Sequence, residues 1–165
     1  RTHRAQTSRL RRRHRADHSM TLLKLKAGDA EDLETIAVLL QDSVVPMSEM
    51  AFKREEQRFA MVANRFRWET SGSGRVEGQI YERVHCGLRF EEVTSVRVQN
   101  LDQNRRGDIL SLLTIGADDG FIDLVFAAGG VVRLEVDHIA CRLEDFDRPW
   151  PTQWRPTHPE ETDDG

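Results

Sequence analysis

The residues of this sequence best suited to metal chemistry are its two cysteines and the histidines near them. His85 directly precedes Cys86, and His138 lies three residues before Cys141. Sulfur and imidazole ligands of this kind bind zinc, but adjacent residues on a strand point to opposite faces, so His85 and Cys86 cannot easily hold one ion. Cys86 also shares the alternation of the apolar residues that follow it, which indicates a core thiol. The sequence therefore predicts no metal site and no cofactor.

Motifs of covalent and phosphate chemistry do not occur in the sequence. It contains no GxSxG, HExxH or SxxK motif. Residues 70–78 are rich in glycine but lack the Lys-Ser/Thr pair of a phosphate loop. Residues 102–113 begin like a calcium-binding loop, yet Arg106 and Leu113 occupy positions that require oxygen ligands. We predict no catalytic residue, and the balance favours a protein that is not an enzyme.

Arginines on predicted strands are the first candidates for binding a partner. Several lie in the phase opposite the apolar residues, and we select Arg67, Arg89 and Arg133. A row of guanidinium groups on an exposed sheet face can hold a carboxylate-bearing or phosphorylated partner. Acids on the same predicted side favour the alternative, an ordinary solvated surface of mixed charge. These acids are Glu82, Glu91, Asp123 and Glu135.

Two tryptophans separated by prolines form the second candidate. Trp150 and Trp154 lie in the sequence PWPTQWRP, which proline keeps extended. Such a stiffened segment loses little conformational entropy when its indoles dock on a surface. The segment either packs on its own domain, which is the more common outcome for a tail, or binds a partner protein.

An amphipathic helix over about 30–42 is the element that the sequence predicts most strongly. Asp29 is a good N-cap, and acids crowd the first turns, where the helix dipole favours them. The apolar stripe of this helix consists of Leu33, Ile36, Ala37 and Leu40. We expect the stripe to cover a sheet, after a short first strand that ends at Ala27-Gly28.

Most of the remaining chain predicts strands, because apolar and polar residues alternate. The apolar phase changes within residues 57–68, which predicts a β-bulge near Ala63-Asn64. Residues 80–90 form a half-buried strand, and residues 93–98 continue it after a further phase slip.

Residues 109–136 predict a three-stranded antiparallel meander with one apolar face. A type I′ turn at Asp119-Gly120 pairs Ile122 with Ala117, Leu124 with Ile115, and Phe126 with Leu113. A loop of residues 128–130 pairs Phe126 with Val132, Leu124 with Leu134, and Ile122 with Val136.

Residues 137–146 fit two different elements. Ile139, Leu143 and Phe146 have the spacing of a short helix, whereas Ile139, Cys141 and Leu143 alternate as in a strand. We favour the helix. The predicted fold class is therefore α+β: a curved, mostly antiparallel sheet with the helix of 30–42 packed on it and a possible second helix at about 137–146.

Charge divides the chain into one domain over 21–148 and two unlike ends. Residues 1–20 form a disordered basic extension, which we take as a non-native extension rather than a native arm or a transit peptide. Residues 149–165 form an extended Trp/Pro tail that ends acidic. Residues 20–155 hold 17 Lys and Arg against 23 Asp and Glu. This acidic body argues against nucleic-acid binding unless the basic arm is native.

The sequence also bears on the compartment. It has no apolar run long enough to span a membrane. Its two cysteines form no CxxC pair and no disulfide-rich pattern, which indicates a reducing compartment. We expect a cytoplasmic protein without a membrane partner.

Five segments carry a resemblance to a known family. They are RFAMVANRFRWE (58–69), GLRFEEVTSV (87–96), LSLLTI (110–115), GGVVRLEVDHI (129–139) and WRPTH (154–158). In this order and spacing the chain resembles the bacterial domain of unknown function 2948, from about Leu22 to about His158. The resemblance implies a bacterial cytoplasmic protein and implies no activity, ligand or catalytic residue.

Two function hypotheses follow from these patterns. A tail suited to partner binding, in a chain without a catalytic pattern, favours a non-enzymatic protein-binding or scaffold module. Such a module would act through the exposed sheet face or the Trp/Pro tail. The alternative is a small-molecule-binding protein or an unrecognised enzyme with a pocket between helix and sheet.

Overall fold

A computed structural model describes residues 22–68, 81–146 and 150–152, and contains eleven strands in one sheet. The first half of the chain forms β1 (Lys24–Ala27), α2 (Ala30–Leu39), β2 (Val44–Pro46), β3 (Met50–Lys53), β4 (Arg58–Phe66) and β5 (Tyr81–Phe90). The second half forms β6 (Val93–Gln99), β7 (Ile109–Asp118), β8 (Phe121–Phe126), β9 (Val131–Val136), β10 (Cys141–Asp145) and β11 (Trp150–Thr152). Every strand pair is antiparallel, so the predicted α+β class is confirmed.

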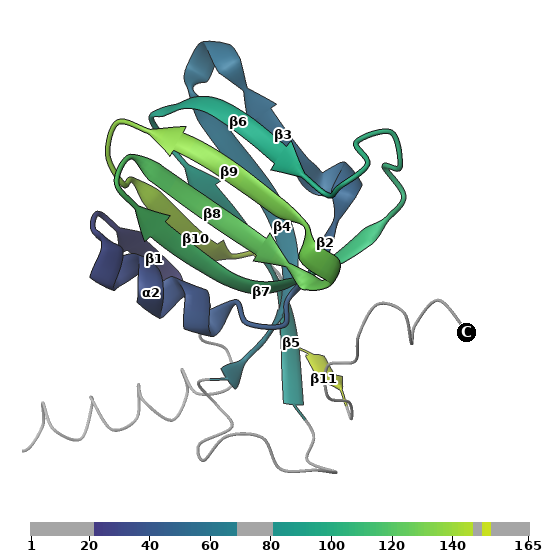
Figure 1. Cartoon of the computed structure of the whole chain (residues 1–165). Coiled ribbons are helices and arrows are strands. Elements are labelled where there is room, and N and C mark those ends of the chain that lie inside the picture. The colour runs from purple at the N-terminus through teal and green to yellow at the C-terminus, as the bar shows by residue number, and fades with distance from the viewer. Residues whose placement is uncertain (1–21, 69–80, 147–149, 153–165) are drawn as a thin grey trace, which may run out of the picture.

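The sheet curves back on itself into two layers (Figure 1). Its strand order is β1-β10-β5-β4-β2-β7-β8-β9-β6, with β3 beside β4 and β11 beside β5. One layer contains β7, β8, β9 and β6, and the other contains β4, β5, β10 and β1, which lie behind the first in Figure 1. The short strand β2 joins the two layers, because it pairs with both β4 and β7.

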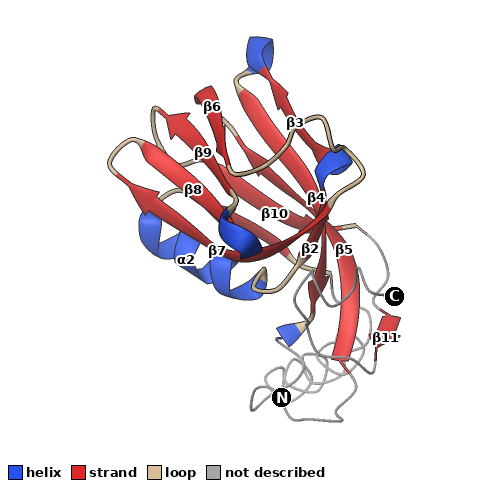
Figure 2. Ribbon diagram, turned by 45° about the vertical axis from the view of Figure 1, so that its right-hand side comes forward, coloured by secondary structure: helices blue, strands red, loops and turns tan. Residues whose placement is uncertain are grey.

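The core lies between the layers, because each strand turns alternate apolar residues inward. Its fully buried members include Ile122, Leu124 and Leu134 from one layer, and Cys86, Leu88 and Phe90 from the other. In the turned view of Figure 2, α2 lies below the layers, in contact with β7 and β1.

The helix follows its prediction closely, although it ends at Leu39 rather than near 42. Asp29 is its N-cap, with Oδ1 accepting a hydrogen bond of 2.8 Å from the backbone N–H of Asp32. The whole predicted stripe is buried: Leu33, Ile36, Ala37 and Leu40. In the described part of the chain, no helix has the length and apolar character that crossing a membrane requires.

The predicted β-bulge near Ala63-Asn64 is wrong. Strand β4 pairs with β5 without interruption from Phe59 opposite Phe90 to Phe66 opposite Arg83. The alternation of buried residues continues through Ala63 to Arg65, which is fully buried. The apparent phase change arose because Arg65 occupies an inward position while the apolar residues Val62 and Phe66 lie in the opposite phase.

The predicted continuation of β5 into residues 93–98 is also wrong. Glu92 has a left-handed backbone (φ 59°), and the chain turns there. As a result β6 leaves the layer of β5 and pairs with β9 at the edge of the other layer.

The meander of 109–136 is confirmed, with two corrections to its register. Ala117–Ile122 and Ile115–Leu124 pair as predicted, but a bulge then places Leu112, not Leu113, opposite Phe126. Leu113 is therefore 42% exposed while Leu112 is fully buried. The turn is not type I′, since only Gly120 of its two central residues has positive φ.

The residues predicted to share a face on β8 and β9 do so, but the two strands pair two residues away from the predicted register. Leu124 lies opposite Val132 and Ile122 opposite Leu134. The loop occupies 127–129, with Ala128 and Gly129 at positive φ. Gly130 is buried, and a Cβ at this position would lie 2.5 Å from Cδ2 of Leu101. This glycine therefore serves close packing and not the turn.

The helix favoured for residues 137–146 is wrong, because Cys141–Asp145 form β10 between β1 and β5. Cys141, Leu143 and Asp145 are buried, and the residues between them are exposed. Pairing on both edges satisfies the backbone of this segment and outweighs its weak helical spacing.

Candidate functional site

The layer of β4, β5, β10 and β1 presents its second set of alternating residues away from the core. We call this surface the outer face. On β1 and β10 its residues are Lys24, Lys26, Arg142 and Glu144, with Phe146 just beyond β10. On β5 and β4 they are Arg83, His85, Gly87, Arg89, Ala60, Val62 and Asn64.

Three cations form a row across the outer face. Lys26 pairs directly with Arg142, and Arg142 pairs directly with Arg89, on three neighbouring strands. Directly opposite residues share a face, and like charges in such positions repel each other. We call these three residues the cationic row. Because the row opposes folding, it is a candidate for a functional site.

The charge of the cationic row is only partly compensated. Arg89 Nε lies 2.8 Å from Glu91 Oε2, but without hydrogen-bond geometry. Glu91 already accepts two hydrogen bonds from Arg58 Nε, at 3.1 and 3.0 Å. Within the described residues, no carboxylate lies in ion-pair range of Lys26 or Arg142, both of which are exposed. The row therefore presents net positive charge to solvent.

An exposed aromatic ring lies on the same face. Phe146 is 55% exposed, and its ring is near-parallel to that of His85, with centroids 6.5 Å apart. The Phe146 ring packs over Gly87, since a Cβ on this residue would be in van der Waals contact with Cε1 of Phe146, at 3.5 Å. The outer face thus combines cations with one large apolar side chain.

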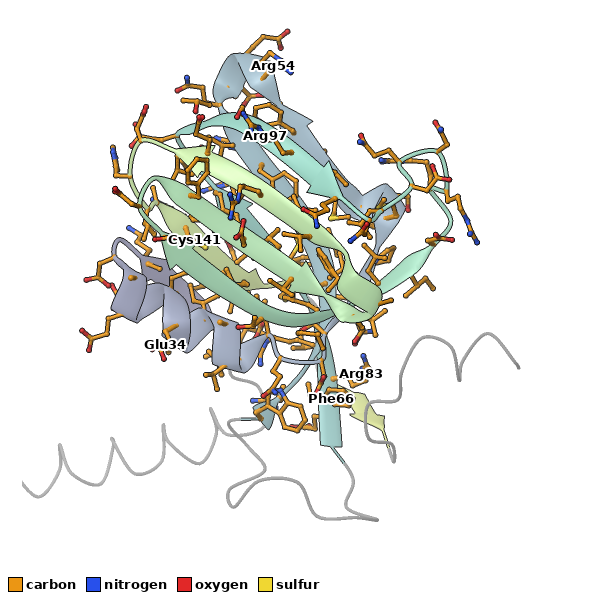
Figure 3. The ribbon with its side chains drawn as sticks, in the orientation of Figure 1. Glu34, Arg54, Phe66, Arg83, Arg97 and Cys141 are labelled. Carbon is orange, nitrogen blue, oxygen red and sulfur yellow. The ribbon has the colours of Figure 1, made fainter. Side chains whose placement is uncertain are left out.

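Arg67 does not contribute to this surface. It is only 2% exposed, and its guanidinium donates a hydrogen bond to Glu82. Its neighbour Phe66 is also buried, under the guanidinium carbon of Arg83, 4.2 Å from the ring centroid (Figure 3). Burial lowers the pKa of Arg83, whose Nε donates to Asn64 Oδ1 at 2.6 Å. Arg67 and Arg83 therefore make their contacts at the adjoining ends of β4 and β5.

Arg133 lies on the other layer and has its own partner. Its guanidinium donates two hydrogen bonds to Asp123, at 2.8 and 2.9 Å, and lies over the ring of Phe121. The hydrogen bond to Asp123 raises the pKa of Arg133. Of the three arginines predicted to bind a partner, the structure therefore places only Arg89 on the outer face, and it does not bring the three together.

The predicted tryptophan candidates lie at the border of the described chain. The backbone of Trp150 is part of β11, where it pairs with Arg83 of β5. This pairing places the start of the Trp/Pro tail along the strand that carries Arg89. Trp154 lies outside the described residues.

A buried ion pair was missed by the sequence analysis. Arg65 donates to both carboxylate oxygens of Asp145, at 2.9 and 2.7 Å, and both side chains are fully buried. Asp145 Oδ2 also accepts from the backbone N–H of Leu23 at 2.9 Å, and Arg65 donates to the carbonyl of Phe66. The pair thus joins β4, β10 and the start of β1. Its one signal in the sequence is that Arg65 continues the buried alternation of β4.

The cysteines and histidines that the structure describes do not assemble a ligand set. Both thiols are buried, and burial raises the pKa of Cys141 to about 12. His138 instead pairs with Glu92 on the surface. Across residues 22–68 and 81–146, no group of three His, Cys, Asp or Glu side chains is arranged to hold a metal ion.

Comparison with known proteins identifies the family of the chain. The family model described as "Protein of unknown function (DUF2948)" matches residues 23–158, which contain every described strand and the helix α2. No curated protein and no solved structure matches the chain. The match covers most of the sequence, and the chain therefore belongs to the DUF2948 family.

Proposed function

We propose that this protein is a non-enzymatic protein-binding module that docks an acidic segment of a partner protein on its outer face. The observation that carries the proposal is the cationic row of Lys26, Arg142 and Arg89, in direct register on three strands. Like charges in this arrangement weaken the sheet. An acidic ligand turns the same arrangement into an attraction, and arginine adds directional hydrogen bonds to carboxylates.

Phe146 supplies the apolar part of the proposed contact. Binding energy in protein interfaces is concentrated in aromatic and arginine side chains that lose water on docking. Phe146 is exposed and lies over Gly87, two residues along β5 from Arg89 of the cationic row, with its ring near-parallel to that of His85. Trp150 and Trp154 remain proposed contacts: the backbone of Trp150 lies in β11, which pairs with β5, whereas Trp154 lies outside the described residues.

The alternative, a ligand pocket between helix and sheet, has no observation in its favour among the described residues. Leu33, Ile36 and Leu40 of α2 belong to the same buried cluster as the sheet residues. The helix thus packs directly on the core.

We propose further that this protein is bacterial and acts in the cytoplasm. The support is that Cys141 is a free thiol buried in the core. A reducing compartment keeps such cysteines unpaired.

The test uses a short glutamate-rich peptide that carries one tryptophan and a fluorescent label. Fluorescence anisotropy at low salt is expected to show binding that weakens as salt increases, because salt screens exposed charges. Arg142→Glu is expected to weaken binding by about tenfold or more, since it reverses the central charge of the row.

Arg133→Glu is the matched control, because Arg133 also projects from a strand but is neutralised by Asp123 on the other layer. It is expected to leave the affinity unchanged. Equal affinities of wild type and Arg142→Glu would refute the proposal.

A further inference from the structure

The exposed side of α2 carries the opposite charge to the cationic row. Glu31, Glu34 and Val38 follow one another at i, i+3 and i+7, and all three are exposed. Figure 3 shows Glu34 on the side of the helix that faces away from the sheet. Val38 is 61% exposed, so this acidic stripe also contains one apolar side chain.

The dimensions of the two patches agree. Neighbouring strands lie about 4.8 Å apart, so neighbouring members of the cationic row are separated by about that distance. Residues one turn apart on a helix are separated by about 5 Å along its axis. A helix that crosses the strands can therefore place Glu31 and Glu34 over adjacent cations, with Val38 further along.

The two patches also lie next to each other in one chain. Helix α2 follows β1 after only Gly28 and Asp29, and β1 is the edge strand that carries Lys26. When one chain carries two adjacent patches of opposite charge, a two-fold axis can place the acidic patch of each protomer on the cationic patch of the other. The apolar residues Val38 and Phe146 are distributed in the same way, one to each patch.

Building on the proposed function, we infer that the acidic partner is a second copy of this chain. In the dimer, α2 of each protomer docks across the cationic row of the other, and the contact occurs twice. Glu31 and Glu34 pair with the row.

The experiment measures the mass of the full-length protein by sedimentation velocity at low and high salt. The wild type is expected to be a dimer at low salt. Arg142→Glu and Glu34→Arg are each expected to produce monomers, whereas the double variant, with both charges exchanged, is expected to restore the dimer. Both positions are exposed, and unchanged circular dichroism with a single cooperative melting transition would verify that the variants fold.

The Glu34→Arg monomer separates this inference from the proposed function, because its cationic row is intact. It is expected to bind the acidic peptide at least as tightly as the wild type, whose row the second α2 occupies in the dimer, whereas the Arg142→Glu monomer is expected to bind it about tenfold or more weakly. A wild type that is monomeric yet binds the peptide would overturn the dimer and keep the proposed function. If the dimer survives both single variants, or if the double variant fails to restore it, α2 does not dock on the cationic row and the inferred interface is overturned. If the wild type binds the peptide and Glu34→Arg does not, the cationic row is not the peptide site.

Discussion

Arg65 shows how a single buried charge can mislead the interpretation of a strand. A reader of the sequence expects arginine outside, because charged residues are almost never fully buried unless they are paired. Its partner Asp145 lies 80 positions away, and no local pattern links the two. The predicted bulge near Ala63-Asn64 followed from that expectation. The fold pairs Arg67 with Glu82 and Arg133 with Asp123, two of the acids that the sequence placed on the same side, and neither guanidinium lies on the outer face.

Replacing Arg65 by methionine is expected to lower the free energy of unfolding by about 3–5 kcal/mol, because Asp145 would be left as a buried and uncompensated charge. Urea denaturation measures the loss. The exposed pair of Arg133 with Asp123 has the same chemistry and provides the control, for which Arg133→Met is expected to have a far smaller effect. Equal losses in the two variants would contradict this account.

Cys141 is expected to resist alkylation in the folded protein. Burial raises its pKa to about 12, so at pH 8 only about one thiol in ten thousand is the reactive thiolate. Iodoacetamide labelling, followed by mass spectrometry of tryptic peptides, is expected to modify Cys141 only when urea unfolds the domain. Rapid labelling in native buffer would show that the strand β10 opens locally.

Arg142 is expected to lower the free energy of unfolding, since it lies between two other cations. Arg142→Thr is expected to raise the free energy of unfolding by about 0.2–1 kcal/mol, because it removes like-charge pairs across the strands. The control is Glu144→Thr on the same strand, which removes an attractive contact with Lys24 and is not expected to stabilise. Denaturation at low and high salt measures both, and a destabilised Arg142→Thr would count against the row as a functional feature.

At the scale of elements, local signals predicted α2 well and β10 poorly. The helix combines an N-cap, acids in its first turn and a full apolar stripe, and these all favour the same structure. Residues 137–146 contain only three apolar residues at helical spacing. Their strand conformation depends on β1 and β5, whose edges β10 fills, and those neighbours are distant in the sequence.

The N-cap of α2 provides a prediction at this scale. Asp29→Ala is expected to lower the free energy of unfolding by about 0.5–2 kcal/mol, because the N–H of Asp32 loses its acceptor. Asp29→Asn keeps a side-chain oxygen in place and is expected to retain most of the stability. Thermal and urea denaturation compare the two variants, and identical losses would show that charge, and not the hydrogen bond, is what matters.

At the scale of the whole molecule, the face of the sheet on which a side chain lies could be predicted, and the order of the strands could not. The inward residues of β8 and β9 were identified correctly, because alternation is a local property, whereas on β7 the bulge buries Leu112 instead of Leu113. The folding of the sheet into two layers depends on long-range pairs such as β2 with β7 and β6 with β9. The cationic row is itself a product of such pairs, so Lys26 and Arg142 could not be selected from the sequence.

The basic extension predicted for residues 1–20 concerns the molecule as a whole. Removal of residues 1–19 is expected to leave the melting temperature unchanged within about 2 °C, because an extension that its composition predicts to be disordered contributes little to domain stability. Differential scanning calorimetry of the full and shortened chains tests this. A large decrease would mean that the arm packs on the domain.

The pairing of β1 with β10 has a consequence for synthesis. Lys24 lies opposite Glu144, so the first strand finds its neighbour only after some 120 further residues have left the ribosome. Until then the early strands carry apolar side chains without their final cover, which is when nascent chains aggregate or recruit chaperones. Chains that terminate before Cys141 would lack the strand between β1 and β5, and they are expected to accumulate as chaperone-bound or degraded fragments.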